Sequence, residues 1–406
     1  MIADEILKKY ILKVPESILG AEKVNFIVEM AQQMPGEDKV ALHKMVNHIL
    51  TLMIEHEASD VEIGGHGTDG FIWFRIHGNK IRVEELPRFT PLEASLLIVS
   101  LLTNNQCKHL LVGRNLDFSY TFHYHVVNKD IRFRADAYFD LDNLALNMRA
   151  ISATTRPLET LGFHQNAIKM MSHSYVKFGL SLVTGITGSG KSTTLDSIID
   201  FHNKFDKAHI VIISSPIEYV HKSNSAIIRH REVGKDVLSF QEGVVQALRQ
   251  DPDIIVIGEM RDPETILAAL EVTDTGHKVF STLHTSSATE SIDRIIAEIN
   301  PAEQERVRNR LADVLISVVS QKLVPTVDKK RVLAKEVLIV TPSVKAAIKN
   351  NNTSEIYLMI VQGGPQGMLS MEQDLLRLVN ERVITKETAV NYANNKTRML
   401  QLLKVT

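Results

Sequence analysis

Apolar side chains recur at spacings of three and four residues through the first 57 positions, the pattern of amphipathic helices. Its members are Ile6, Leu7, Ile11, Leu12, Phe26, Ile27, Met30, Leu42, Met45, Val46, Ile49 and Met53. The turn-forming run Pro35-Gly36-Glu37-Asp38 interrupts the pattern, so we expect separate helices on either side of it. The sequence therefore predicts a helical N-terminal extension over residues 1–57.

The pattern changes to strict alternation after about residue 58. Aromatic residues alternate with small polar ones over 118–124, and apolar residues alternate with charged ones over 131–137. A period of two indicates strands with one buried face. A further short strand over 71–76 and a helix over 91–103 complete a small α+β domain, which we place at residues 58–155.

Residues 156–164 contain Pro157 and Gly162 around a short turn, which is typical of a linker. Nearly unbroken apolar runs then alternate with helical patterns. The runs cover 180–183, 210–213, 254–257 and 279–283, and the helical patterns cover 191–203, 240–250 and 263–273. Strands buried on both faces and separated by helices predict an α/β fold with a parallel sheet, over residues 165–300. Residues 301–406 are expected to be mostly helical.

Composition narrows the class of protein. The net charge of −2 gives no electrostatic reason to expect nucleic acid as a partner. The single cysteine, Cys107, excludes a disulfide framework and a four-cysteine zinc site. No apolar run reaches the roughly 18 residues of a membrane span, and charged residues such as Asp4 and Lys8 interrupt any signal peptide. We therefore expect a cytoplasmic protein whose membrane contact runs through a partner.

The most informative motif is Gly185–Ser192, a complete G-x-x-x-x-G-K-S run. Glycines allow consecutive backbone amides to cradle phosphates, the lysine supplies a cation and the serine hydroxyl can ligate Mg²⁺. A chance glycine-serine loop is the alternative, but the run lies between a predicted strand and a predicted helix, as the motif requires. The predicted nucleotide-binding residues are Gly185, Thr187, Gly188, Ser189, Gly190, Lys191, Ser192 and Thr193.

Two glutamates follow predicted strands of the same sheet, where ligands of such sheets bind. Glu259 ends the apolar run 254–257 and is a candidate for orienting the attacking water. Glu218 follows the run 210–213 and could bind Mg²⁺. A surface carboxylate is the alternative for Glu259, and a helix-capping or surface acid is the alternative for Glu218.

A histidine and three arginines complete the candidates. His284 follows the run 279–283, where it could contact the γ-phosphate or Glu259, although a lone histidine is more often structural. Arg132 and Arg134 share the polar face of one predicted strand, and Arg149 lies in the same domain. Arginines can accelerate phosphoryl transfer, but exposed arginines on a strand are often simply solvated.

Five segments in this order and spacing resemble the secretion-ATPase superfamily, and within it the pilus-retraction ATPases of type IV pili. The segments are Gly185–Thr194, Pro216–His221, Arg231–Gly234, Asp251–Asp262 and Thr275–Thr285. The resemblance implies a PAS-like N-terminal domain, a RecA-like P-loop ATPase core and a homohexameric ring. It also implies ATP and Mg²⁺ as cofactors and an inner-membrane platform protein as the partner.

The resemblance assigns roles to the candidate residues. Lys191 and Ser192 match the phosphate-binding motif, and Glu259 matches the catalytic glutamate. Glu218 matches the last acid of a conserved acidic box, and His284 matches a histidine-box residue. Arg132, Arg134 and Arg149 match positions from which the family supplies arginines to the nucleotide.

Three departures from the family pattern stand out. Ser214-Ser215 occupies positions where the family has Glu-Asp, which removes two acids near the expected Mg²⁺. Lys345 and Lys349 replace the arginines of a helix typical of the retraction subfamily, and lysine lacks the planar fork of arginine. Residues 1–57 precede the usual start of the family.

The sequence predicts a hexameric, Mg²⁺-dependent ATPase motor of type IV pilus retraction, located at the cytoplasmic side of the inner membrane. A pilus-assembly or type II/IV secretion ATPase is one alternative, although assembly relatives usually carry a four-cysteine zinc insert. A weakly hydrolysing accessory subunit of such a motor is the other, and Ser214-Ser215 favours it.

Overall fold

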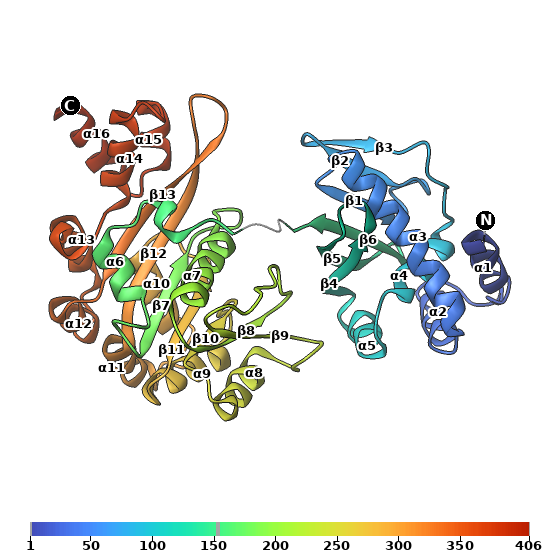
Figure 1. Cartoon of the computed structure of the whole chain (residues 1–406), viewed down its shortest axis with the longest axis horizontal. Helices are drawn as coiled ribbons and strands as arrows, with labels where there is room; N and C mark the ends of the chain where they lie inside the picture. Colours follow the sequence, from blue (N-terminus) through green and yellow to red (C-terminus); the bar gives the residue numbers. More distant parts are fainter. Residues whose placement is uncertain (1, 152–154, 406) are drawn as a thin grey trace. The chain divides into compact units, whose positions relative to one another are not determined.

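A computed structural model describes residues 2–151 and 155–405 of the chain (Figure 1). The chain forms two compact units. The first comprises residues up to 153 together with Ser215–Tyr219, and the second comprises the remaining residues from 154 to the C-terminus. The end predicted for the α+β domain, residue 155, adjoins residues 152–154, which lie outside the described part. The predicted linker contains the short 3-10 turn η2 (Leu158–Leu161).

The N-terminal unit is built on a six-stranded antiparallel sheet in the order β3-β2-β1-β6-β5-β4. The strands are β1 (Asp60–Gly64), β2 (Trp73–Ile76), β3 (Asn79–Arg82), β4 (Asn115–Tyr124), β5 (Lys129–Asp140) and β6 (Asn143–Ala150). The strands predicted around 71–76, 118–124 and 131–137 correspond to β2, β4 and β5. β1, β3 and β6 were not predicted. A turn of only two residues, Leu141-Asp142, joins β5 to β6, and both residues have positive φ angles.

Five helices accompany this sheet: α1 (Ile2–Ile11), α2 (Glu22–Gln32), α3 (Gly36–Glu55), α4 (Pro91–Ser100) and α5 (Asn104–Gly113). The predicted helix 91–103 corresponds to α4, which ends at Ser100; a separate helix, α5, follows it, and the capping box of Thr103 and Gln106 marks its start. Helix α3 begins directly after Pro35, where the sequence predicted a break.

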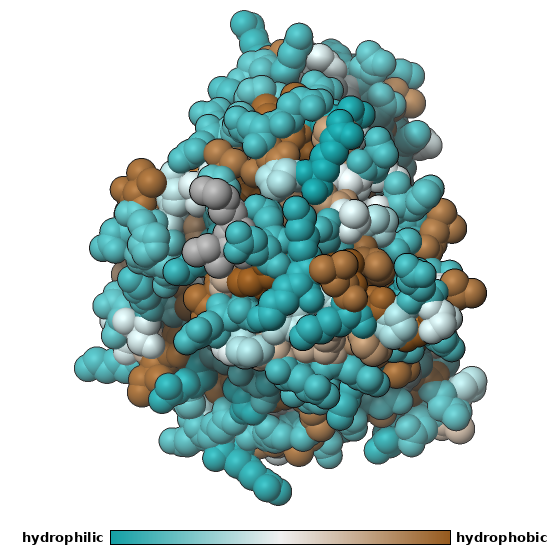
Figure 2. Space-filling model, turned by 90° about the vertical axis from the view of Figure 1, so that its right-hand side faces the viewer, coloured by the Kyte–Doolittle hydropathy of each residue, from teal (hydrophilic) through white to brown (hydrophobic). Residues whose placement is uncertain are grey.

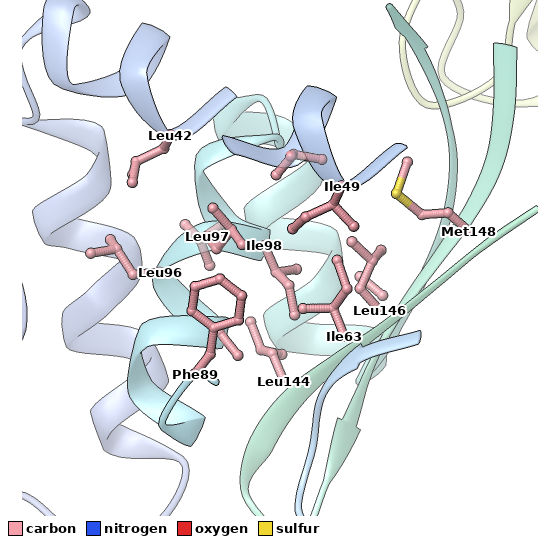
Figure 3. Packing of buried hydrophobic residues seen from close by; sticks show 14 of the residues in the cluster. Leu42, Ile49, Ile63, Phe89, Leu96, Leu97, Ile98, Leu144, Leu146 and Met148 are labelled. Atoms are coloured by element: carbon pink, nitrogen blue, oxygen red, sulfur yellow. The ribbon is translucent and has the colours of Figure 1, made fainter. Parts of the chain in front are cut away.

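One hydrophobic core unites the helices and the sheet of the N-terminal unit. Leu42 and Ile49 of α3 lie with residues of α4 and with Ile63, Leu144 and Leu146 of the sheet (Figure 3). Leu7 of α1, which is 1% exposed, belongs to the same core. The expected boundary at residue 57 therefore does not separate two compact units, because the apolar faces of the first helices are buried against the domain that follows.

The second unit is built on a seven-stranded sheet in the order β13-β12-β7-β11-β10-β8-β9. The strands are β7 (Gly179–Thr184), β8 (His209–Ser214), β9 (Ile227–Glu232), β10 (Ile254–Ile257), β11 (Lys278–Leu283), β12 (Leu315–Pro325) and β13 (Arg331–Ile339). All neighbours are parallel except β12 and β13. The four predicted strands are present, and every residue of β7, β10 and β11 is buried, as expected for strands covered on both faces.

The C-terminal region differs from the expectation of a mostly helical segment, because β12 and β13 lie in it. β12 pairs with β7, the strand that leads into the phosphate loop, so the sheet predicted over residues 165–300 extends beyond residue 300. Ser317, Ser320 and Gln321 interrupt the apolar pattern of β12, yet each is almost completely buried. β12 was not predicted because the prediction relied on continuous apolar runs, and these buried polar residues interrupt the run.

Eleven α-helices are described in the second unit. They are α6 (Gln165–Met171), α7 (Lys191–Phe205), α8 (Phe240–Ala247), α9 (Pro263–Asp274), α10 (Ala288–Ala297), α11 (Gln304–Val314), α12 (Pro342–Lys349), α13 (Ile356–Gln362), α14 (Met371–Asn380), α15 (Lys386–Tyr392) and α16 (Lys396–Val405). The last three pack on the outer ends of β12 and β13 around a small apolar core of their own. Short 3-10 turns occur at His125–Val127, Leu248–Gln250, Thr353–Glu355 and Gly364–Gln366.

Among the described residues, no helix combines the length and the apolar character needed to cross a membrane. The face drawn in Figure 2 is mainly hydrophilic, with hydrophobic side chains in several separate places. Scattered apolar side chains of this kind are usual on protein surfaces.

Candidate nucleotide-binding site

The phosphate loop has the strand–loop–helix setting that the sequence predicted. β7 ends at Thr184, the loop follows, and α7 begins at Lys191. Gly188 and Gly190 have φ angles of 78° and 90°, a region that side chains disfavour. Thr187, Ser192 and Thr193 are exposed, so their polar groups are accessible at the N-terminus of a 15-residue helix. Such a helix end attracts phosphate through its unpaired amides and its dipole.

The ammonium group of Lys191 lies back over the loop. Its Nζ donates to Gly185 O at 2.8 Å and to Ile186 O at 3.2 Å. These carbonyls hold the cation at the loop, where it can be transferred to phosphate oxygens when a nucleotide enters.

Glu259 stands at the carboxyl end of β10, after Gly258. The turn is fixed by two backbone hydrogen bonds, from Gly258 N to Ile213 O and from Met260 N to Thr282 O. These bonds join the turn to the strands on both sides of β10. The Glu259 side chain is 18% exposed, so neighbouring residues cover most of its surface.

Arg261 and His284 both approach the carboxylate of Glu259. Arg261 Nε lies 2.7 Å and His284 Nε2 lies 3.7 Å from the same oxygen, Glu259 Oε2. Sequence reasoning missed Arg261 because it considered only the acid of the segment. The signal was available, since Arg261 lies two residues beyond Glu259 at the same end of the sheet.

The environment of His284 favours the neutral imidazole. Burial lowers the pKa of His284, and the nearby cations Lys191 and Arg261 lower it further, whereas Glu259 opposes the shift. Arg294 Nη1 donates to His284 O at 3.1 Å and holds the backbone of this segment. A neutral histidine can accept or donate a hydrogen bond in response to a bound phosphate without carrying charge.

A chain of buried hydroxyls connects the His284 segment with the base of the phosphate loop. Thr285 Oγ1 lies 2.6 Å from Ser291 Oγ, which donates to Thr184 Oγ1 at 3.4 Å. Thr184 Oγ1 in turn lies 2.7 Å from Ser320 Oγ of β12. The segments that follow β7 and β11 are therefore linked by polar contacts beneath the loop.

Glu218 and the three arginines are described with the N-terminal unit. Arg134 Nη1 lies 3.8 Å from Glu218 Oε1, and Arg132 Nη2 donates to Ile217 O at 2.9 Å. Arg149 Nε instead pairs with Asp60 Oδ1 at 2.7 Å on the neighbouring strand β1. The remaining candidates, Lys191, Glu259 and His284, lie together in the second unit.

Ser214 ends β8 beside the strand that delivers Glu259. A Cβ atom at Gly258 would lie 2.5 Å from Ser214 Oγ, so the two positions are in close contact. A glutamate at position 214 would place a second carboxylate next to the turn of Glu259. Serine lowers the negative charge at this edge of the sheet.

The residues present fit Mg²⁺ bound together with a nucleotide. Within the described residues, no group of three or more histidine, cysteine or acidic side chains is arranged to hold a metal ion. Mg²⁺ keeps several waters and usually takes one or two protein oxygens plus phosphate oxygens. The exposed hydroxyl of Ser192 and one carboxylate suit such a partial shell.

Lys345 and Lys349 tie α12 to the end of α11. Lys349 Nζ lies 2.7 Å from Asp313 Oδ1, and Lys345 Nζ donates to Asp313 O at 3.1 Å. Lys345 and Lys349 thus both make contacts within the chain.

Comparison with known proteins identifies a matching protein family and relatives that are similar over most of the chain. A family model described as Type II/IV secretion system protein matches residues 36–357. The twitching motility protein of Neisseria gonorrhoeae is 38% identical over 326 residues, which are 80% of this chain and 85% of that protein. The type IV pilus retractation ATPase PilT of Pseudomonas aeruginosa is 37% identical over 345 residues, which are 85% of this chain and 96% of that protein.

A solved structure agrees with these sequence matches. The crystal structure of the pilus retraction motor PilT with bound ADP superposes with a TM-score of 0.76 at 35% identity, covering 87% of this chain and 98% of that one. The α/β fold class predicted from the sequence is thereby confirmed.

Proposed function

The chain belongs to the family of type II/IV secretion system proteins, and we propose that it is an ATP-hydrolysing motor that powers type IV pilus retraction. The observation that supports this function best is the joint position of a complete phosphate loop, Glu259 and His284 at one end of the sheet. The names of the relatives, a twitching motility protein and a pilus retraction ATPase, support the coupling to pili.

We assign the binding step to the phosphate loop and the start of α7. The amides of the loop and the ammonium of Lys191 neutralise the β- and γ-phosphates. Ser192 and Glu218 would hold Mg²⁺, which supplies further charge neutralisation at the phosphates. Binding draws Lys191 away from the carbonyls of Gly185 and Ile186 that hold it in the free protein.

We assign activation of water to Glu259. The carboxylate accepts a hydrogen bond from water and takes its proton as the water oxygen bonds to the γ-phosphorus. The bond from the γ-phosphorus to the β,γ-bridging oxygen breaks, and ADP leaves with that oxygen. Arg261 and His284 keep the Glu259 carboxylate oriented, and Arg132, Arg134 and Arg149 are proposed to approach the nucleotide from the N-terminal unit.

The proposed assembly is a homohexamer at the cytoplasmic side of the inner membrane. Nucleotide at each subunit boundary would change the arrangement of the units, and a membrane platform protein would receive the motion. The resemblance to retraction ATPases and the matched PilT structure support this assembly.

Substitution of Glu259 by Gln tests the proposed function directly. The amide keeps the size of the side chain but cannot take a proton, so ATP binding should persist while turnover falls by about 10²–10⁴-fold. Steady-state phosphate release and binding of a fluorescent ATP analogue measure the two quantities. Undiminished turnover in this variant would refute the role of Glu259.

Ser214 favours a second candidate, a weakly hydrolysing accessory subunit of the same kind of motor. The wild-type assembly distinguishes the two, because an accessory subunit would bind ATP and assemble without measurable turnover. A deletion strain separates retraction from assembly or secretion: excess pili that fail to retract support retraction, and loss of pili supports assembly.

A further inference from the structure

The side chain of Gln321 lies directly beneath the phosphate loop. Gln321 is 1% exposed, and its Nε2 donates to Ser189 O at 2.9 Å. Two glycines of the loop face the same residue: a Cβ atom at Gly185 would lie 2.5 Å from Gln321 O, and one at Gly190 would lie 3.3 Å from Gln321 Nε2. The phosphate loop therefore packs directly against Gln321 of β12.

Two buried polar atoms at the contact between the loop and β12 lack a hydrogen bond among the residues that the structure describes. They are the hydroxyl oxygen of Ser189 and the amide oxygen of Gln321. Ser189 is 2% exposed. One atom is a possible donor and the other an acceptor, and their residues are already joined through Ser189 O. Unpaired buried polar atoms are unfavourable, so a hydrogen bond between these two atoms would stabilise the loop.

The ammonium group of Lys191 and the backbone of Ser189 share one acceptor in the loop. Ile186 O accepts hydrogen bonds both from Lys191 Nζ at 3.2 Å and from Ser189 N at 3.1 Å. The lysine thus holds the same turn of the loop that positions Ser189. When the ammonium moves to phosphate oxygens, Ile186 O loses one of these two hydrogen bonds, and the turn that positions Ser189 is held less tightly.

We propose that Gln321 is a positioning residue of the phosphate loop, and that the Ser189 hydroxyl bonds to the Gln321 amide oxygen when the nucleotide phosphates bind. This inference rests on the proposed function, because it requires Lys191 to transfer to a phosphate. The new bond stabilises the loaded loop, while the bond from Gln321 Nε2 to Ser189 O is kept in both states. Part of the ATP affinity therefore comes from a contact that touches no phosphate.

The test compares Ser189→Ala with Ser317→Ala in the full-length chain. Both changes remove one buried hydroxyl, but Ser317 Oγ already donates to Ser181 Oγ at 3.0 Å, away from the loop. Ser189→Ala should weaken binding of a fluorescent ATP analogue about three- to tenfold and leave the melting temperature of the nucleotide-free protein unchanged. Ser317→Ala should show the opposite pattern, a lower melting temperature and unchanged affinity.

A double variant tests whether the two side chains act together. Gln321→Leu should weaken binding more than Ser189→Ala, because it also removes the bond to Ser189 O. The Ser189→Ala change should then have no further effect in the Gln321→Leu background.

Two results would contradict the inference alone, and a third would contradict the proposed function as well. Equal ATP affinity of the Ser189→Ala and Ser317→Ala variants would overturn the inference, and so would additive losses in the double variant. A wild-type chain that binds no ATP would instead contradict the proposed function, and the inference with it.

Discussion

Arg261 combines a close ion pair with a largely exposed side chain. Its Nε lies 2.7 Å from Glu259 Oε2, although 65% of the arginine side chain is accessible to solvent. Exposure weakens such a pair, because water and salt screen the charges. The contribution of Arg261 is therefore expected to be one of orientation rather than of stability.

Replacement of Arg261 by Gln should lower kcat about three- to tenfold with little change in KM, because the Glu259 carboxylate loses one orienting contact. Steady-state kinetics with ATP separate the two constants. Arg261→Lys is the matched control: it keeps the charge without the planar fork and should recover only part of the rate. A variant that raises KM and leaves kcat intact would place Arg261 in substrate binding instead.

Residue types explain which site residues were predictable. The phosphate loop was found from its complete motif, and Glu259 was found because it follows the apolar run 254–257. Gln321 was not found, because a buried glutamine has no motif and its role depends on contact with a loop 132 positions away in the sequence. Only the folded sheet brings them together.

At the scale of elements, a buried glutamate of β13 binds the N-terminus of α10. Glu336 Oε1 of β13 accepts a hydrogen bond from Ala288 N at 2.8 Å, and the side chain is 2% exposed. Burial raises the pKa of Glu336 to about 7, and the neighbouring Glu372 reinforces the shift while Lys322 opposes it. This carboxyl group is therefore protonated in the folded protein at pH values where an exposed glutamate is ionised.

The shift predicts how stability depends on pH. The folded state binds more protons than the unfolded state between the ordinary pKa of 4.5 and the value of about 7, so the free energy of unfolding falls as pH rises through this range. Glu336→Gln cannot ionise and should be more stable than wild type at pH 8 by about 1–3 kcal/mol, with little difference at pH 5. Thermal melts at both pH values measure the effect.

Glu355→Gln, at an exposed position of the same unit, provides the control and should show no comparable difference. Equal stability of wild type and Glu336→Gln at pH 8 would contradict the raised pKa.

The elements themselves were predictable to different degrees. Strands with continuous apolar residues, such as β10, were located almost to the residue. β12 was missed, because Ser317, Ser320 and Gln321 satisfy hydrogen bonds inside the fold that sequence periodicity cannot anticipate.

At the scale of the whole molecule, the N-terminal helices form part of the first unit rather than an appendage. The family match begins at residue 36, yet Leu7 of α1 and Ile27 of α2 are buried in the common core. The sequence predicted these helices, but it could not show where their apolar faces are buried, because that depends on contacts distant in the chain.

Leu7→Ala should lower the free energy of unfolding of the first unit by about 2–5 kcal/mol, since it removes a side chain that is 1% exposed. Leu12→Ala removes the same atoms from a side chain that is 86% exposed and should change stability by less than about 0.5 kcal/mol. Urea denaturation of the full chain compares them. Similar stabilities of the two variants would mean that α1 is not part of the core.

Two consecutive residues of β12, Gln321 and Lys322, contact different parts of the second unit. Gln321 supports the phosphate loop, whereas Lys322 Nζ donates to Tyr392 O at the end of α15 and to Asn394 Oδ1 between α15 and α16. Neighbouring side chains of a strand point to opposite faces, so the insertion or deletion of a single residue in β12 would exchange these partners. We therefore expect this chain to tolerate a change of length in the turn at 326–330, which joins β12 to β13, far better than one within β12.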